Sequence, residues 1–65
     1  MEIFLNGTLH DLEAHNLADA LNALGYRDAI VATAVNGRFV QATARPDTAL
    51  ADGDEIEVVA PMQGG

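Results

Sequence analysis

The sequence contains no cysteine, no tryptophan and no lysine, and aromatic residues make up only 5% of it. Without cysteine the chain can form no disulfide bond, and it offers neither a thiolate nucleophile nor a thiolate ligand for a metal ion. A reactive thiol and a cysteine-bound metal are therefore excluded as functional groups. The fold must be stabilised by the packing of its side chains alone.

Positive charge is scarce, because only three arginines stand against ten acidic residues and the net charge is -7. Such a chain repels phosphate backbones and anionic lipids, so its charge argues against nucleic acids and membranes as partners. The complementary partner is a protein with a basic surface.

Long apolar runs are also missing, although hydrophobic residues make up 49% of the chain. No stretch approaches the ~20 apolar residues of a membrane-spanning helix, and Met1-Glu2-Ile3 has no basic segment of the kind that opens a signal peptide. We therefore expect a cytoplasmic protein. Its 65 residues suffice for one domain, and a domain of this size buries only about 60% of the unfolded chain's surface.

The first residues carry the pattern of a β-hairpin. Asn6-Gly7, a dipeptide typical of two-residue hairpin turns, separates two segments of alternating hydrophobicity that reach from Glu2 to Glu13. With this turn Phe4 lies opposite Leu9, and the two side chains share one face of the hairpin. The other face then carries four side chains, those of Ile3, Leu5, His10 and Leu12.

A short amphipathic helix is predicted next. Asn16 can cap its N-terminus, Asp19 follows three residues later, and Gly25 can end it. Apolar residues recur between these ends with helical spacing: Leu17, Ala20, Leu21 and Leu24. About eight residues are too few to form a stable helix alone in water, so the helix must pack against a sheet.

Three further strands are predicted. Residues 30–35 and 38–41 flank a second Asn-Gly turn, and residues 55–59 follow the turn Asp52-Gly53-Asp54. In the last strand the alternation directs Ile56 and Val58 inward. The other three residues of that strand, Glu55, Glu57 and Val59, then face outward. Val31, Val35 and Val40 share one face, and residues 42–50 are expected to form a loop with one helical turn that directs Leu50 toward the core.

The predicted order is β, β, α, β, β, β, which is typical of the ubiquitin-like β-grasp fold. In that α+β fold a mixed five-stranded sheet has one helix across one face, and the last strand returns beside the first. We expect residues 1–59 to form this domain and residues 60–65 to form an extended, flexible C-terminal tail that ends in Gly64-Gly65.

The C-terminal residues have a composition suited to entering a narrow channel of another protein. Pro61 restricts its own backbone and that of Ala60, and Gly64-Gly65 removes all side chains near the final carboxylate. Six residues beyond Val59 can carry that carboxylate ~20 Å from the sheet, at ~3.3 to 3.6 Å per residue. The alternative interpretation is a frayed end without function.

Five segments occur in a characteristic order: residues 1–7, the helix 17–25, Val35-Asn36-Gly37, residues 52–56 and Gln63-Gly64-Gly65. Together they make the whole chain resemble the ThiS family, the sulfur carriers of thiamine biosynthesis. Each motif is common, but their order at this length is specific. Two positions depart from the family pattern: Thr33 stands where an aliphatic residue is expected, and Asn16 replaces a threonine-type cap.

The resemblance implies a carrier that is not itself an enzyme and binds no cofactor. The carboxylate of Gly65 is expected to be adenylated by an E1-like enzyme that uses ATP and magnesium, and then converted to a thiocarboxylate. A cysteine desulfurase is an example of the sulfur donor, and thiazole synthase is the acceptor. Met62, Gln63 and Gly64 form the rest of the functional tail.

Three other functions fit parts of the sequence. The small subunit of molybdopterin synthase is a longer β-grasp protein with the same tail, and a ubiquitin-like modifier uses the tail to form isopeptide bonds. The third alternative is a β-grasp interaction module whose tail has no function. The length of this chain and Gln63 before the glycines favour the thiamine branch.

Several surface residues are candidates for sites. Phe4, Leu9 and Val59 are predicted to form a docking patch for the partner on the face that the helix leaves open, unless another segment covers them. His10 and His15 lack a third ligand, so no metal site is predicted. The acidic residues between 52 and 57 lack the spacing of a calcium loop. The three arginines, Arg27, Arg38 and Arg45, are interpreted as solubilising residues.

Overall fold

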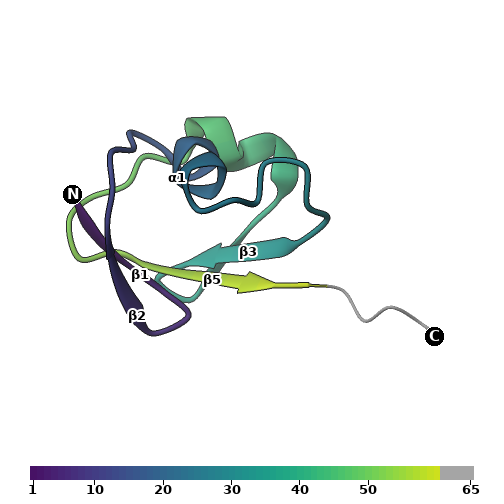
Figure 1. The fold of residues 1–65 in the computed structure, drawn as a ribbon. Coiled ribbons are helices and arrows are strands. Elements are labelled where there is room, and N and C mark those ends of the chain that lie inside the picture. The colour runs from purple at the N-terminus through teal and green to yellow at the C-terminus, as the bar shows by residue number, and fades with distance from the viewer. Residues whose placement is uncertain (61–65) are drawn as a thin grey trace.

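The computed structural model describes residues 1–60, which form one five-stranded mixed sheet with an α-helix and a 3-10 helix on one of its faces (Figure 1). The elements are β1 (Glu2–Leu5), β2 (Thr8–Asp11), α1 (Leu17–Ala23), β3 (Ala32–Val35), β4 (Arg38–Val40), η1 (Ala42–Asp47) and β5 (Glu55–Val59). The strand order is β2-β1-β5-β3-β4, in which β1 and β5 are parallel and the other pairs antiparallel. The predicted α+β fold, with the last strand returning beside the first, is confirmed.

Both Asn-Gly dipeptides form the predicted hairpin turns. Asn6 and Gly7 have φ angles of 49° and 86°, and Asn36 and Gly37 have 51° and 82°. Positive φ at both central residues is the requirement of the type I′ turn, which asparagine and glycine tolerate best. The first turn sets the predicted register, since Phe4 pairs with Leu9 and Leu5 with Thr8. β2 ends at Asp11, two residues earlier than predicted.

The helix begins at Leu17 as predicted and ends at Ala23, one residue before the predicted Leu24, which is its C-cap. The side chain of Asn16 accepts a hydrogen bond of 2.8 Å from the backbone N–H of Asp19, which caps the first turn. At the other end the N–H of Tyr26 donates to the carbonyl of Leu21 at 2.8 Å, while Gly25 has a φ of 93°. This is the Schellman arrangement, in which a left-handed glycine closes the helix.

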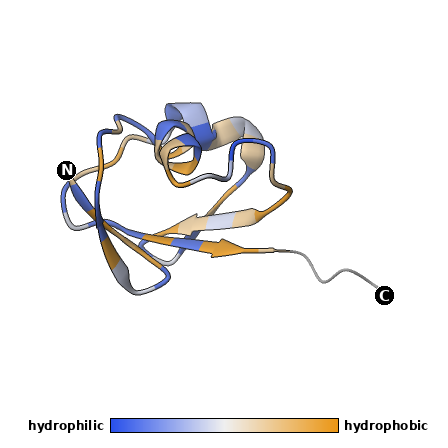
Figure 2. Cartoon of the chain, viewed as in Figure 1, coloured by the Kyte–Doolittle hydropathy of each residue, from blue (hydrophilic) through white to orange (hydrophobic). Residues whose placement is uncertain are grey.

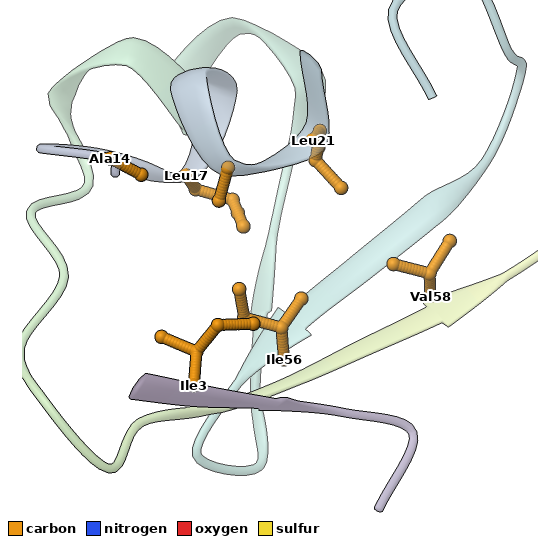
Figure 3. Close-up of a cluster of buried hydrophobic side chains, with 7 residues drawn as sticks. Ile3, Ala14, Leu17, Leu21, Ile56 and Val58 are labelled. Atoms are coloured by element: carbon orange, nitrogen blue, oxygen red, sulfur yellow. The ribbon is translucent and has the colours of Figure 1, made fainter. Parts of the chain in front are cut away.

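The core lies between α1 and the sheet (Figure 3). In the close-up, Leu17 and Leu21 point from the helix toward Ile3, Ile56 and Val58 on the strands. Ile3, Leu17 and Ile56 are fully buried. Leu50 packs against the same cluster after η1, as predicted for the loop 42–50.

The strand predicted over residues 30–35 begins only at Ala32, and Ile30 is 84% exposed. The reason is the length of its neighbours. β5 pairs with β3 as far as Val59 opposite Ala32, and β4 ends at Val40 opposite Thr33, so no described strand lies beside residues 30 and 31. The fourth strand likewise ends one residue early, because Gln41 already occupies the N-cap position of η1.

Arg45 is a structural residue, and its interpretation as a solubilising side chain was wrong. Its Nε donates to the hydroxyl of Thr33 at 3.0 Å, and its Nη2 donates to the carbonyl of Val31 at 2.7 Å. The Thr33 hydroxyl in turn donates to the carbonyl of Val40 at 2.8 Å. These bonds satisfy the hydroxyl of a residue that is only 2% exposed, which explains why a threonine is tolerated where an aliphatic residue was expected.

Neither helix of residues 1–60 combines the length and the apolar character needed to cross a membrane.

Candidate functional site: the central strand and the open face of the sheet

The strand that leads to the C-terminal residues lies in the middle of the sheet. β5 pairs with β1 on one side and with β3 on the other, and its residues alternate between buried and exposed as predicted. The predicted tail residues Met62, Gln63, Gly64 and Gly65 lie outside the described residues. The last strand residue before them is Val59, and its strand pairs with a neighbouring strand on each side. The predicted tail of residues 60–65 stays a prediction.

Asn6 holds the C-terminal half of β5. Its backbone N–H donates to the carbonyl of Ile56 at 2.9 Å. Its side-chain Nδ2 donates to the carbonyl of Val58 at 3.1 Å, and its Oδ1 accepts the N–H of Val58 at 2.9 Å. β1 ends at Leu5, so the side-chain amide of Asn6 supplies the donor and the acceptor that a further strand residue would have offered.

Asn36, in the second hairpin turn, holds the N-terminal end of the same strand. Its Oδ1 accepts the N–H of Glu55 at 2.9 Å, and its Nδ2 donates to Oδ1 of Asp54 at 3.0 Å. The other oxygen of Asp54 accepts the N–H of Ala51 at 2.8 Å, and Oδ1 of Asp52 accepts the N–H of Glu2 at 2.8 Å. These two aspartates stabilise the turn before β5, as the sequence indicated.

The face of the sheet opposite α1 carries all the side chains predicted to dock a partner. Phe4 is half-buried there, and Leu9 and Val59 are 52% and 62% exposed. The structure brings Phe4 and Leu9 together as a cross-strand pair. Val59 lies apart from them, because Phe4 is level with Glu55 and four more residues of β5 span ~13 Å. Their role in docking stays a prediction.

Phe39 is an exposed aromatic residue of this face that the sequence analysis did not single out. It projects from β4 and is 70% exposed. A signal for it was available, since an inward Val40 places its neighbour Phe39 outward by the alternation of the strand. Phe39 and Val59 border a shallow hollow of about 180 Å³ that is also lined by Ala32, Ala34 and Glu57.

The two histidines are separate. His10 lies half-buried opposite Ile3, on the predicted face, and His15 is exposed. Among residues 1–60, no three His, Asp or Glu side chains gather where they could hold a metal ion.

The comparisons with known proteins agree with this architecture. The model of the ThiS family matches residues 3–65. This chain belongs to the ThiS family. A curated relative, the sulfur carrier protein ThiS of Thermus thermophilus, is 40% identical over 63 residues, which cover 97% of this chain and 98% of the relative.

Two solved structures from Geobacter metallireducens, one of a thiamine biosynthesis protein (ThiS) and one of a thiamine biosynthesis protein, are similar to this structure. The crystal structure has a TM-score of 0.84 and 29% identity, with 100% of both chains covered. The solution NMR structure has a TM-score of 0.77 and 28% identity, covering 100% of this chain and 88% of the other. The resemblance to ThiS sulfur carriers that the sequence indicated is therefore confirmed, and so is the fold.

Proposed function

We propose that this ThiS-family chain carries sulfur for thiamine biosynthesis as a thiocarboxylate on Gly65. The observation that supports the proposal most strongly is that the family match runs through residue 65 and thus includes Gly64-Gly65. The second support is structural: β5, which leads to these residues, is the central strand and is held on both sides.

A carboxylate does not react with a sulfur nucleophile until one of its oxygens becomes a good leaving group. In the proposed first step, a carboxylate oxygen of Gly65 attacks the α-phosphate of ATP, pyrophosphate leaves, and a mixed anhydride with AMP forms. A sulfur nucleophile then attacks the carbonyl carbon and displaces AMP. Hydrosulfide gives the thiocarboxylate directly, whereas the persulfide of a donor enzyme gives an acyl persulfide, whose S–S bond is then cleaved by a thiol that is itself oxidised to a disulfide. The ATP, the magnesium and the cationic groups for the first step belong to an E1-like activating enzyme, which agrees with the net charge of -7 on the carrier.

In this proposal the carrier is a substrate of its partners and no enzyme. The domain of residues 1–59 docks on the activating enzyme through the open face, which includes the predicted docking residues Phe4, Leu9 and Val59. The tail of residues 60–65 reaches the active site. A sulfur donor such as a cysteine desulfurase loads the activated end, and thiazole synthase receives the sulfur.

Deleting Gly65 tests the proposal. The purified carrier is incubated with its activating enzyme, ATP, magnesium and a sulfur source, and its intact mass is measured. The full chain is expected to gain the mass of one oxygen-to-sulfur exchange, located by fragmentation at Gly65. The deletion variant is expected to keep its melting temperature and to gain nothing, because its carboxylate ends ~3.5 Å short.

Gln63→Ala is the matched control, since it changes the tail but keeps both terminal glycines and the reach of the carboxylate. It is expected to be loaded. Loading of the Gly65 deletion at the rate of the full chain would refute the assignment of the reactive carboxylate.

The enzyme that accepts sulfur from the loaded carrier shows to which pathway the carrier belongs. Adding thiazole synthase and its sugar-phosphate substrate is expected to remove the sulfur. Discharge by molybdopterin precursor and its synthase alone would assign the carrier to that pathway. Bonds to lysines of other proteins, formed without any thiocarboxylate, would assign it to the protein modifiers.

A further inference from the structure

Two large apolar side chains stand exposed on either side of β3. Phe39 on β4 is 70% exposed, and Val59 at the end of β5 is 62% exposed. β4 and β5 both pair with β3, so the two strands lie ~10 Å apart on the same sheet. One exposed apolar residue is ordinary, but two that flank a common strand form a patch that can mark an interaction site.

The residues of β3 that face outward between them are small. Ala34 pairs with Phe39 on one side and with Glu57 on the other, and Ala32 pairs with Val59. The two alanine side chains are shorter than the side chains on either side of them, so they form the bottom of a groove. We name the resulting open groove the Phe39–Val59 groove and define it by Ala32, Ala34, Phe39, Glu57 and Val59; its volume is about 180 Å³.

The groove has the size and the lining for one apolar side chain. An apolar cavity of roughly 150 Å³ takes up a benzene ring, so about 180 Å³ can receive a leucine, methionine or phenylalanine side chain. Glu57 is its one charged wall residue. Within residues 1–60 the only ion pair joins the N-terminal amine to Asp11, so Glu57 has no cationic partner in this part of the chain.

We propose that the Phe39–Val59 groove receives an apolar side chain of the activating enzyme, and that an arginine or lysine next to that side chain pairs with Glu57. The partner's identity rests on the proposed function, whereas the groove and its charged wall are features of this chain. The docking centre then lies at Phe39 and Val59, and Phe4 and Leu9 at the far side of the face contribute less.

The charge of the chain favours a basic partner over a second copy. Each copy carries a net charge of -7, so two copies repel each other. Glu55 and Glu57 both face outward on β5 beside the groove, which would place four carboxylates in an interface between two copies. A basic partner removes this repulsion and gains speed of association from the opposite charge.

The position of the groove connects docking to the chemistry. Val59 is both a wall of the groove and the last residue of β5. A partner that fixes Val59 therefore fixes the start of the six residues that reach at most ~20 Å to the terminal carboxylate. A contact at Leu9, at the opposite edge of the face, would not directly fix the start of these six residues.

Two substitutions in the full chain test the groove, one by removing a side chain that borders it and the other by filling it. Phe39→Ala removes a wall, and Ala34→Leu fills the floor without removing any apolar surface. Both are expected to raise the Kd for the activating enzyme about tenfold or more, measured by isothermal titration calorimetry. Ile30→Ala is the matched control, because Ile30 is 84% exposed but lies outside the sheet; its Kd is expected to stay unchanged.

Steady-state ATP–pyrophosphate exchange gives a second readout. Both groove variants are expected to raise the KM for the carrier and to leave kcat unchanged, because a saturated enzyme receives an intact tail. Circular dichroism confirms that each variant is folded at the assay temperature. Wild-type Kd and KM values in both folded variants would overturn the proposal, and so would a larger effect of Leu9→Ala than of Phe39→Ala.

The salt dependence of association tests the charged wall. Glu57→Gln is expected to slow association and to make the rate less sensitive to salt than in the wild type. Glu13→Gln is the charge-matched control, since Glu13 is exposed and lies beyond β2. Equal salt sensitivity of the two variants would refute the role of Glu57. Sedimentation of the chain alone as a dimer that Phe39→Ala dissociates would instead assign the groove to a second copy.

The two proposals fail in different ways. If Gly65 is loaded with sulfur while the groove variants bind as the wild type does, the groove proposal is wrong and the carrier function stands. If the groove variants lose binding but no sulfur is loaded, the surface is a docking site of a protein with another function.

Discussion

Asn6 is predicted to stabilise the end of the central strand through its side chain, and Asn6→Gly isolates this contribution. The residue has a φ of 49°, which glycine adopts without strain. Alanine would add the cost of a left-handed backbone, so it is the poorer test. In the folded state Asn6→Gly therefore keeps the turn and removes the two side-chain hydrogen bonds to Val58.

The expected loss follows from the geometry of these bonds. Both are partly buried, at 3.1 and 2.9 Å, and a hydrogen bond of this kind contributes about 1 kcal/mol net. The substitution is therefore expected to lower the free energy of unfolding by about 2 kcal/mol from the two bonds. In a domain of this size that corresponds to a melting temperature lower by roughly 8 to 16 °C.

Asn36→Gly is the matched control. Asn36 occupies the same turn position with a φ of 51° and also makes two side-chain hydrogen bonds, to Asp54 and Glu55. Both substitutions increase the freedom of the unfolded chain equally, by about 0.4 to 1 kcal/mol. The bonds of Asn36 are exposed, so water can partly replace them and each contributes only about 0.5 kcal/mol. Asn6→Gly is therefore expected to cost about 1 kcal/mol more than its control.

Urea unfolding measures the difference, and amide hydrogen exchange locates it. The N–H of Val58 donates to Oδ1 of Asn6, so its exchange is expected to accelerate in Asn6→Gly and to remain slow in Asn36→Gly. Equal losses of stability in the two variants, or unchanged exchange at Val58, would refute the role that we assign to the Asn6 side chain.

The sequence predicted those parts of the fold that depend on local geometry. Each Asn-Gly turn fixes the register of its hairpin through two residues, and the cap of Asn16 involves a residue three positions away. The inward and outward residues of β5 follow from alternation alone, because the strand is covered on one face only. Figure 2 displays this alternation and the hydrophobic C-terminal end of β5.

The contacts that the sequence did not predict join distant residues. Asn6 and Val58 are 52 positions apart, and the pattern indicated only the turn at Asn6. Arg45 and Thr33 come from η1 and β3, and neither carries a local signal for the other. The groove beside Phe39 depends on two alanines of a neighbouring strand, so its shape becomes visible only once the sheet is assembled.

Three further substitutions test the structural assignments by urea unfolding. Asn16→Ala removes the helix cap and is expected to cost about 1 kcal/mol, whereas Asn22→Ala, at an exposed position inside α1, is expected to cost nothing. Arg45→Ala removes two partly buried hydrogen bonds and is expected to cost about 2 kcal/mol; the exposed Arg38→Ala is the control, and an equal loss there would contradict the structural role of Arg45. Thr33→Val makes the buried position aliphatic, but it removes the oxygen that accepts from Arg45 and donates to a strand carbonyl, so it too is expected to destabilise the chain. Because Thr33 and Arg45 share one hydrogen bond, the double variant is expected to lose less than the sum of the single losses, by about 0.5 kcal/mol or more. Additive losses would refute the coupling through the shared hydrogen bond. A Thr33→Val chain more stable than the wild type would mean that burial of the methyl groups outweighs the hydrogen-bond network at this position.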